Sequence, residues 1–314
     1  MKRSQALLAV VLLLASLGLV QAAPKSAKAP APPPEPEQIV LRHGLSGAPL
    51  DVLATLALRF NDEEAKLKAG GGRIQLEDVQ GVADKGQLPH LALFDQDDAM
   101  AMFDTRPRFR PLHQVMATGK QNFDAKHFYP QMIDTVDDLA GRMQALPLAM
   151  SLPVLFYNKT AMAKAGLDPA VPPKTWWELQ EVAGKLRDSG SKCPLTSSRF
   201  AWVHVENVAA QHNEPLVVKN GKQDQLALNN MVNVKHMALL TSWQKSFYFI
   251  YSGPGREGDD RFATGECAML TGESVLYARL ARQKPDFQFG IAELPYYDDV
   301  YGVRPTHVLP DGAA

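Results

Sequence analysis

The chain has 314 residues, and its 33 lysines and arginines nearly balance its 34 aspartates and glutamates, which leaves a formal net charge of −1. This balance lacks the basic excess of a nucleic-acid-binding protein, and no block of like charge indicates a solvating tail. We therefore expect no nucleic-acid partner, and we expect any ligand to be recognised by specific side chains.

The beginning of the chain has the composition of a leader rather than of a folded domain. MKRSQ carries two positive charges, an apolar run of about 15 residues follows, and QAAP supplies small residues for cleavage. We therefore interpret residues 1–22 as a secretory signal peptide that is cleaved after Ala22, and we expect the mature protein in the periplasm. Residues 23–37, APKSAKAPAPPPEPE, predict an extended Ala/Pro-rich linker.

Strand-like and helix-like segments alternate through the next part of the chain. QIVLRH (38–43) is a strand candidate, and PLDVLATLALRF (49–60) places apolar residues at helical spacing. RIQLEDV (73–79) alternates like a half-buried strand, HLALFD (90–95) is another strand candidate, and DDAMAMF (97–103) predicts a helix. Strands separated by helices predict a layered α/β fold with a parallel sheet.

The second half repeats this alternation. LPVLFYN (152–158) predicts a strand and TAMAKAGL (160–167) a short helix. Thr175 and Glu178 form a capping-box pattern at the start of a helix over 176–190. Because about 275 residues exceed one comfortable core, we expect two lobes. The remaining candidates are strands at 192–198, 267–270 and 288–297 and helices at 234–249 and 273–283.

Motifs for cofactors, metals and catalysis are weak or missing. The two cysteines, Cys193 and Cys267, permit one disulfide in an exported protein, although two separate buried thiols remain the alternative. GPGREG (253–258) matches a dinucleotide fingerprint, but a polar segment follows it, so we interpret it as a loop. HVEN (204–207) offers one metal ligand without companions. We therefore predict no cofactor, no metal and no enzymatic activity.

Polar and aromatic side chains follow several of the predicted strands. Ligands of α/β sheets collect beyond the carboxyl ends of strands, so these side chains are candidates for a cleft formed by both halves. Taken singly, each of them has a structural or surface role as the alternative. The candidates are Arg42, His43, Asp95, Ser151, Arg199, Trp202 and the stretch Thr271–Ser274.

A series of segments carries a family resemblance. LPVLFYNK, KAGLDP, PPKTWWEL, RFATGECAML and ELPYYDDVYG occur in this order from residue 152 to residue 302. They resemble the periplasmic solute-binding proteins of ABC importers (extracellular solute-binding family 1), most of all the glycerol-3-phosphate-binding type. The resemblance implies a type II-like periplasmic-binding-protein fold, in which two lobes, each a mostly parallel sheet flanked by helices, close on a solute about a hinge. It places lobe 1 at 38–147, the hinge at 148–151, lobe 2 at 152–297 and a return to lobe 1 at 298–314.

The same resemblance implies the role of the chain and of particular residues. A protein of this kind would bind a glycerol phosphate or sugar-like solute, deliver it to an inner-membrane ABC permease, and act as a monomer. Matching positions make Asp95 an acidic ligand contact, Ser151 a hinge serine and Trp202 a pocket aromatic. Ser274 or its neighbour Glu273 matches a serine beside a helix start, where backbone N–H groups can hold phosphate. Gly312 matches a glycine whose backbone faces the ligand.

Departures from the family pattern leave other functions open. Arg42 and Arg199 stand where the family type has aromatic residues, and either could supply bidentate contacts to an anion. Members of that type also continue well past residue 314, so the C-terminal part of lobe 1 is expected to be missing here. One alternative is a degenerate solute-binding scaffold that serves as an interaction or regulatory protein. Another is a hydrolase that pairs Asp95 with Glu273.

Overall fold

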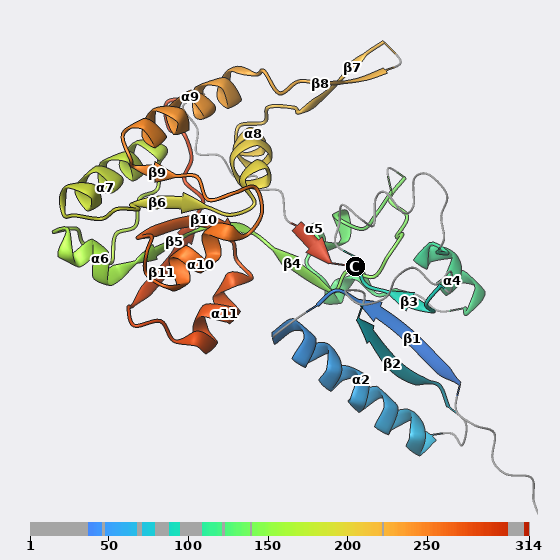
Figure 1. The fold of residues 1–314 in the computed structure, drawn as a ribbon. Coiled ribbons are helices and arrows are strands. Elements are labelled where there is room, and N and C mark those ends of the chain that lie inside the picture. The colour runs from blue at the N-terminus through green and yellow to red at the C-terminus, as the bar shows by residue number, and fades with distance from the viewer. Residues whose placement is uncertain are drawn as a thin grey trace, which may run out of the picture.

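The computed structural model describes residues 37–45, 48–67, 71–78, 88–94, 109–120, 123–138, 140–221, 223–300 and 311–313. Figure 1 shows the elements in two groups, which we call the first and the second lobe. Several predictions fall outside the described residues: the signal peptide at 1–22, the linker at 23–37 apart from its last residue, the helix at 97–103, and Asp95. The first lobe contains β1 (Gln38–His43), α2 (Ala48–Leu67), β2 (Arg73–Asp78), β3 (Leu91–Ala92), α4 (Leu112–Thr118), the 3-10 helix η2 (Ala125–His127) and α5 (Pro130–Asp134).

The first lobe is built on a three-stranded parallel sheet in the order β2-β1-β3. These strands form at the segments for which the apolar pattern predicted them, and α2 packs on β2. The Asn61 side chain fastens α2 to this edge strand, because its amide donates to the Ile74 carbonyl at 3.0 Å and accepts from the Ile74 N–H at 2.7 Å. Edge backbone groups that would otherwise face solvent are thereby paired.

The second lobe holds most of the buried core. Its elements are β5 (Pro153–Asn158), α6 (Lys159–Lys164), α7 (Trp176–Asp188), β6 (Leu195–Ser197), the π-helix η3 (Trp202–Asn207), α8 (Val208–Gln211), β7 (Val217–Asn220), β8 (Gln223–Leu226), α9 (Met231–Lys245), β9 (Phe249–Ile250), α10 (Glu257–Ala263), β10 (Met269–Glu273), α11 (Leu276–Gln283) and β11 (Phe289–Glu293).

The sheet of the second lobe has five strands in the order β11-β5-β10-β6-β9. β10, β6 and β9 are parallel to one another, whereas β5 runs antiparallel to both of its neighbours, β10 and β11. Four of the five strands therefore share one direction. The expected fold class, two α/β lobes with mostly parallel sheets, is confirmed.

Helices cover both faces of this sheet, because alternate residues of its strands point to opposite sides. On one face, Leu155 and Met269 pack with Trp176 of α7 and Trp243 of α9. On the other face, Phe156, Leu270 and Phe262 form a smaller core with two leucines of α11. Each fully buried aliphatic or aromatic side chain contributes roughly 1.5–3 kcal/mol through removal from water.

The helix ends follow local sequence signals. The capping box predicted for α7 is confirmed: the Thr175 hydroxyl accepts from the Glu178 N–H at 3.1 Å, and the Glu178 carboxylate accepts from the Thr175 N–H at 3.2 Å. After α6, Gly166 takes a φ of +70°, a left-handed conformation that glycine adopts without strain.

Two predicted helices of the second lobe have wrong boundaries. The helix expected at 234–249 runs from Met231 to Lys245, because the Asn230 side chain caps its start and Phe247, with φ 58°, ends it. Phe249 instead begins the strand β9. The helix expected to start at Glu273 begins at Leu276, because Glu273 pairs with Pro153 as the last residue of β10.

Strands also connect the two lobes. β4 (Ala149–Ser151) pairs antiparallel with β12 (Asp311–Ala313), and Figure 1 shows this pair between the lobes. The β7–β8 hairpin, which the sequence did not suggest, projects from the second lobe (Figure 1). None of the helices in the described part of the chain combines the length and apolar content that a membrane span requires.

Candidate functional site

Two candidate serines meet where the lobes connect. Ser151 ends β4 and Ser274 follows β10, and their hydroxyl oxygens lie 3.3 Å apart although 123 residues separate them in sequence. The Leu152 N–H donates to Ser274 Oγ at 3.0 Å, and the Val275 N–H donates to Ser151 Oγ at 3.3 Å. The end of β4 and the start of α11 are therefore joined by reciprocal hydrogen bonds around the two hydroxyls.

Gly312 belongs to the same region. It pairs with Met150 across the β4–β12 ladder, and its neighbour Asp311 pairs with Ser151. Three candidate residues from distant parts of the sequence, Gly312, Ser151 and Ser274, are thus brought together at the junction of the lobes.

Glu273 lies beside this region and is engaged in an ion pair. Its side chain is 3% exposed, and the Arg256 guanidinium donates to both carboxylate oxygens, at 2.6 Å from Nε and 3.1 Å from Nη2. Arg256 was not among the predicted site residues, because it lies in the GPGREG segment that was interpreted as a loop. This pairing neutralises Glu273, and it engages both of the oxygens that a hydrolytic role would need.

Arg199 and Trp202 lie on the segment that follows β6. Arg199 has a φ of 50°, a conformation uncommon for residues other than glycine, and its guanidinium carbon lies 5.7 Å from the centre of the Trp202 ring. The Arg199 N–H donates to the Gly255 carbonyl, so the segments that carry Arg199 and Arg256 are held side by side. Trp202 itself is largely buried.

The first-lobe candidates have a different setting. Arg42 lies in β1 opposite Glu77 of β2, and its Nε donates to the Glu77 carboxylate at 3.0 Å. His43, at the end of the same strand, is 3% exposed, and its Nδ1 has no hydrogen-bond partner among the described residues. Arg42 thus stabilises the pairing of β1 with β2. Asp95 cannot be placed, because it lies outside the described residues.

A buried chain of hydrogen bonds lies behind the Trp202 segment. Thr271 Oγ1 lies 3.0 Å from His204 Nε2, His204 Nδ1 lies 2.9 Å from His236 Nε2, and His236 Nδ1 lies 2.7 Å from the Tyr297 hydroxyl. All four side chains are fully buried. No spacing signal in the sequence pairs His204 with His236, which lie 32 residues apart.

Burial governs the protonation of this chain. It lowers the pKa of His204 from its usual value of 6.5 to about 3 and holds the pKa of His236 well below that value. Burial likewise raises the pKa of Tyr297. Both imidazoles are therefore neutral at physiological pH, and each has one N–H donor and one acceptor nitrogen for its two partners.

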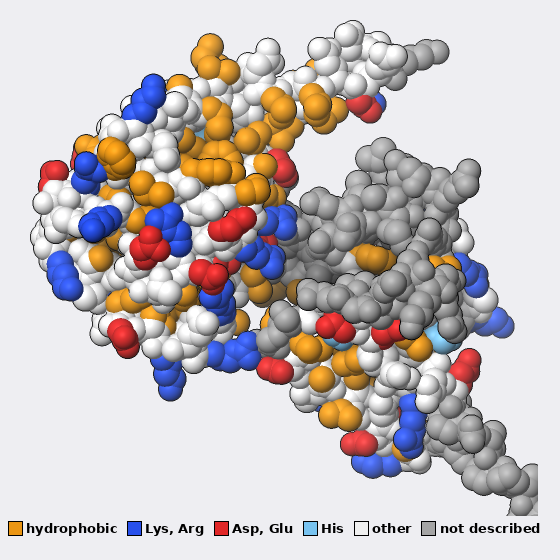
Figure 2. All heavy atoms as spheres, viewed as in Figure 1, with side chains coloured by type: hydrophobic (Ala, Val, Ile, Leu, Met, Phe, Trp, Pro, Cys, Tyr) orange, Lys and Arg blue, Asp and Glu red, His pale blue; other side chains and the backbone are white. Residues whose placement is uncertain are grey.

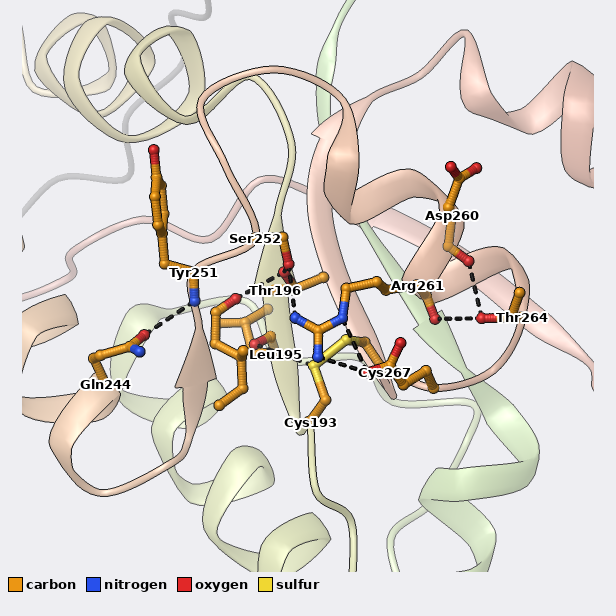
Figure 3. Close-up of a disulfide and its surroundings, with 12 residues drawn as sticks. Cys193, Leu195, Thr196, Gln244, Tyr251, Ser252, Asp260, Arg261, Thr264 and Cys267 are labelled. Carbon is orange, nitrogen blue, oxygen red and sulfur yellow. Dashed lines mark hydrogen bonds and ion pairs between the residues drawn. A yellow bond between two sulfur atoms is a disulfide. The ribbon is translucent and has the colours of Figure 1, made fainter.

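A disulfide closes the opposite end of the sheet. Cys193 and Cys267 are joined, as the sequence permitted, with Cα atoms 4.5 Å apart (Figure 3). They precede the parallel strands β6 and β10, whereas Arg199 and Ser274 follow them. The disulfide therefore fixes the two strands at the end remote from the candidate site. In the described part of the chain, no three His, Cys, Asp or Glu side chains gather in a way that could hold a metal ion.

Charged side chains of both signs surround the junction of the lobes (Figure 2). Arg282 of α11 forms an ion pair with Asp51 of α2 at 3.0 Å, which connects the two lobes directly. Arg279 of the same helix pairs with Asp260. These ion pairs are exposed, and neither sign of charge dominates the surface around them.

Two lobes of this construction, linked by crossing strands, define the class of two-lobe periplasmic binding proteins. Solved structures share the fold. UgpB from Mycobacterium tuberculosis in complex with glycerophosphocholine superposes with a TM-score of 0.69 at 20% identity, over 88% of this chain and 71% of that one. The cyclic alpha-maltosyl-1,6-maltose binding protein from Arthrobacter globiformis superposes with a TM-score of 0.66 at 19% identity, over 88% of this chain and 70% of that one.

Sequence relatives are more specific. The sn-glycerol-3-phosphate-binding periplasmic protein UgpB of Pectobacterium atrosepticum is 32% identical over 282 residues, which cover 87% of this chain and 63% of that protein. The protein of the same name from Salmonella typhi is 37% identical over 210 residues, which cover 65% and 48%. The chain thus spans less than two thirds of the length of these relatives. The family model for bacterial extracellular solute-binding proteins matches residues 59–313, and the chain belongs to this family.

Proposed function

We propose that this protein is the periplasmic solute-binding component of an ABC importer and that it takes glycerol 3-phosphate, a related glycerophosphodiester or a sugar-like solute. Its relatives are named for binding glycerol 3-phosphate, and structures of the same fold are named for glycerophosphocholine and oligosaccharide ligands. The same proposal has four further parts. The protein is exported through a cleaved signal peptide at residues 1–22, is a monomer, has no enzymatic role, and delivers its solute to an inner-membrane permease.

The observation that carries this proposal is the convergence of Ser151, Ser274 and the Val275 N–H at the junction of the lobes. The Ser151 and Ser274 hydroxyls can donate hydrogen bonds to phosphate oxygens, and the start of α11 adds a favourable dipole. We place the hinge at 148–151, between a first lobe at 38–147 and a second lobe at 152–297, with residues 298–314 returning to the first lobe. Asp95 and Gly312 would complete the solute contacts from the first-lobe side.

The charges of the second lobe support an anionic solute. Glu273 would repel a phosphate, but its ion pair with Arg256 compensates that charge. Arg199 then adds a guanidinium beside Trp202, on a segment tied to that of Arg256. A guanidinium suits phosphate because its planar N–H donors match two oxygens at once. Trp202 would supply an apolar surface for the carbon atoms of the solute.

Calorimetric titration with sn-glycerol 3-phosphate, glycerophosphocholine and maltose tests this function directly. We expect one of the two phosphate compounds to bind and to raise the melting temperature by mass action. Arg199→Gln removes the charge but retains a polar side chain. A hydrogen bond to a charged group contributes roughly 1.5–3 kcal/mol, so the Kd should rise about 10- to 150-fold.

Arg187→Gln is the matched control, because the Arg187 guanidinium also lies over an aromatic ring, that of Phe247, but at the end of α7. Its Kd should stay within about twofold of the parent value, as expected for a surface substitution outside the site. A folded protein that binds none of the three solutes would overturn the proposal and favour a degenerate scaffold that binds another protein.

A further inference from the structure

The buried side chains Thr271, His204, His236 and Tyr297, which we call the histidine relay, connect two parts of the proposed solute site. Thr271 lies on β10, three residues before Ser274. His204 lies in the π-helix, two residues after Trp202. The 3.0 Å hydrogen bond between Thr271 Oγ1 and His204 Nε2 therefore joins the strand that leads to Ser274 to the helix that presents Trp202.

The far end of the relay is anchored in the rigid core of the second lobe. The Tyr297 ring packs against Trp176 and Trp177 of α7, with centroid distances of 6.3 and 5.8 Å. His236, which is hydrogen-bonded to the Tyr297 hydroxyl, belongs to α9, and its ring centroid lies 4.6 Å from that of Trp176. The hydrogen-bond chain thus connects Thr271 to the two packed helices α7 and α9.

The segment that the relay holds has an unusual backbone. It starts with Arg199 at a φ of 50° and continues as a six-residue π-helix, a form that is rare and is frequently found at functional sites. Such an unfavourable backbone conformation persists only where contacts with the surrounding structure hold it in place. Asn207 supports the π-helix from its other end, because its side chain donates to the Trp202 carbonyl at 3.0 Å.

The relay can hold this backbone firmly because its hydrogen bonds are mutually dependent. Two neutral imidazoles in series permit one continuous direction of donation, either from Tyr297 toward Thr271 or the reverse. Loss of one end therefore leaves a buried imidazole nitrogen without its partner. His204 also stacks on His236 with an interplanar angle of 22° and a centroid distance of 5.1 Å, so a shift of one ring displaces the other.

We propose that His204, acting through the histidine relay, is a positioning residue that holds Arg199 and Trp202 in register with Ser274. This role rests on the proposed function, because it concerns the affinity of the same solute site. His204 itself is fully buried and touches Thr271, His236 and aromatic rings rather than solvent.

Thr271→Val is the sharpest test, because it removes the hydroxyl that accepts or donates at the end of the relay and keeps the shape of the side chain. Thr196→Val is the matched control. Thr196 is equally buried, but its hydroxyl donates to the Ile250 carbonyl of the neighbouring strand β9 at 2.8 Å and lies 2.7 Å from the Ser252 hydroxyl (Figure 3). Thr271→Ser restores a hydroxyl and should rescue the effect.

The first measurement is amide hydrogen exchange of the segment 199–207 in the solute-free protein. We expect exchange there to become at least about tenfold faster in Thr271→Val than in the control, since local opening is governed by the local free energy of the segment. The second measurement is the Kd for sn-glycerol 3-phosphate, which should rise about tenfold in Thr271→Val and less than about twofold in Thr196→Val.

The two measurements separate this inference from the proposed function. Faster exchange confined to 199–207, rescued by Thr271→Ser, supports the positioning role even when the parent protein binds no glycerol 3-phosphate, a result that would overturn the proposed function alone. Exchange at 199–207 that is no faster in Thr271→Val than in Thr196→Val overturns the positioning role. So does an equal rise of the Kd in both variants.

Discussion

Glu273 is the most tightly enclosed charge that the candidate site offers, and its stability depends on one partner. The carboxylate is 3% exposed and both of its oxygens are bound by Arg256, whose own side chain is 58% exposed. Removing one partner of such a pair leaves a buried charge without compensation. Because Arg256 faces solvent, water can replace part of what is lost.

We predict that Arg256→Ala lowers the free energy of unfolding at pH 7 by about 1–3 kcal/mol, the cost of a buried polar group that loses its partner. Arg279→Ala is the control, because Arg279 pairs with the exposed Asp260 and should cost no more than about 1 kcal/mol. Urea denaturation of the two variants measures both values. An equal loss of unfolding free energy in the two variants would mean that the pairing of Glu273 with Arg256 stabilises the fold no more than an exposed ion pair does.

Individual site residues were predictable from the sequence to different degrees. Ser151 and Ser274 were proposed from strand ends and from the family resemblance, and the structure brings their hydroxyls to 3.3 Å. Arg42 was proposed on the same grounds, but its pairing with Glu77 depends on the register of β1 against β2, which composition does not reveal. Arg256 escaped notice because its role arises from a contact with Glu273, 17 residues away, that depends on the fold.

At the scale of elements, the disulfide stiffens one end of two parallel strands. Cys193 and Cys267 enclose a separation of 74 residues in sequence, and they sit where β6 and β10 begin. Around the disulfide, the Cys267 N–H donates to the Arg261 carbonyl at 3.0 Å, and Arg261 donates to Ser252 at 2.9 Å. The strands therefore start from a fixed base, while their other ends carry the candidate site.

We predict that replacing both cysteines, as Cys193→Ala with Cys267→Ala, destabilises the protein by about 2–4 kcal/mol, because the unfolded chain regains the entropy of an open loop. The Kd for the solute should stay within about twofold of the parent value, since the site lies at the opposite end of the strands. Thermal denaturation and calorimetric titration of the same preparation measure the two effects. A large loss of affinity in a still-folded variant would contradict this separation.

Helices and strands were predicted where the local sequence pattern is strong, and they were missed where tertiary contacts determine the backbone conformation. Apolar periodicity and the Thr175–Glu178 box identified α2 and α7, because their signals lie within a few residues. The π-helix at Trp202–Asn207 carries no such signal: its geometry depends on the Asn207 side chain and on the buried His204. The end of α9 likewise depends on Phe247 in a left-handed conformation, which the residue type disfavours.

For the whole molecule, chain length predicted two lobes, whereas the division of the chain between them came from the resemblance rather than from periodicity. Alternating strands and helices predict an α/β fold but do not say how the chain divides or crosses. The antiparallel β5, the pairing of β4 with β12 and the ion pair between Arg282 and Asp51 all connect residues far apart in sequence. Such long-range pairings are the part of a fold that local sequence patterns leave open.

The buried histidines give the whole molecule a defined response to acid. Burial lowers the pKa values of His204, His236 and His212 below the usual 6.5. Near pH 6 these histidines therefore bind protons in the unfolded chain but not in the folded protein. Stability is then complete above pH 6.5 and declines as the pH falls toward the folded-state value of about 3 for His204. Each fully depressed group contributes a slope of about 1.4 kcal/mol per pH unit in this window.

Other titrating groups can be separated from this effect by the choice of window. The carboxyls of Asp138, Glu266 and Asp299 have pKa values lowered by hydrogen bonds to basic side chains, so their contributions are lost only at lower pH. Asp259 acts in the opposite direction, because burial raises its pKa and its protonation favours the folded state as the pH falls. Among the groups with lowered pKa values, the histidines are therefore the ones that lose their contribution between pH 6.5 and 5.

We predict that the free energy of unfolding, measured by urea denaturation, falls by about 1–3 kcal/mol between pH 6.5 and pH 5, the range that one or two depressed histidines supply. His204→Phe preserves the packing of a ring but removes one titrating group, so its stability should be lower at pH 6.5 yet decline less steeply toward pH 5. The steepness, rather than the absolute stability, isolates proton linkage from lost hydrogen bonds. A variant whose profile runs parallel to that of the parent would show that His204 already takes up its proton in the folded state, and that the relay is not built from neutral imidazoles.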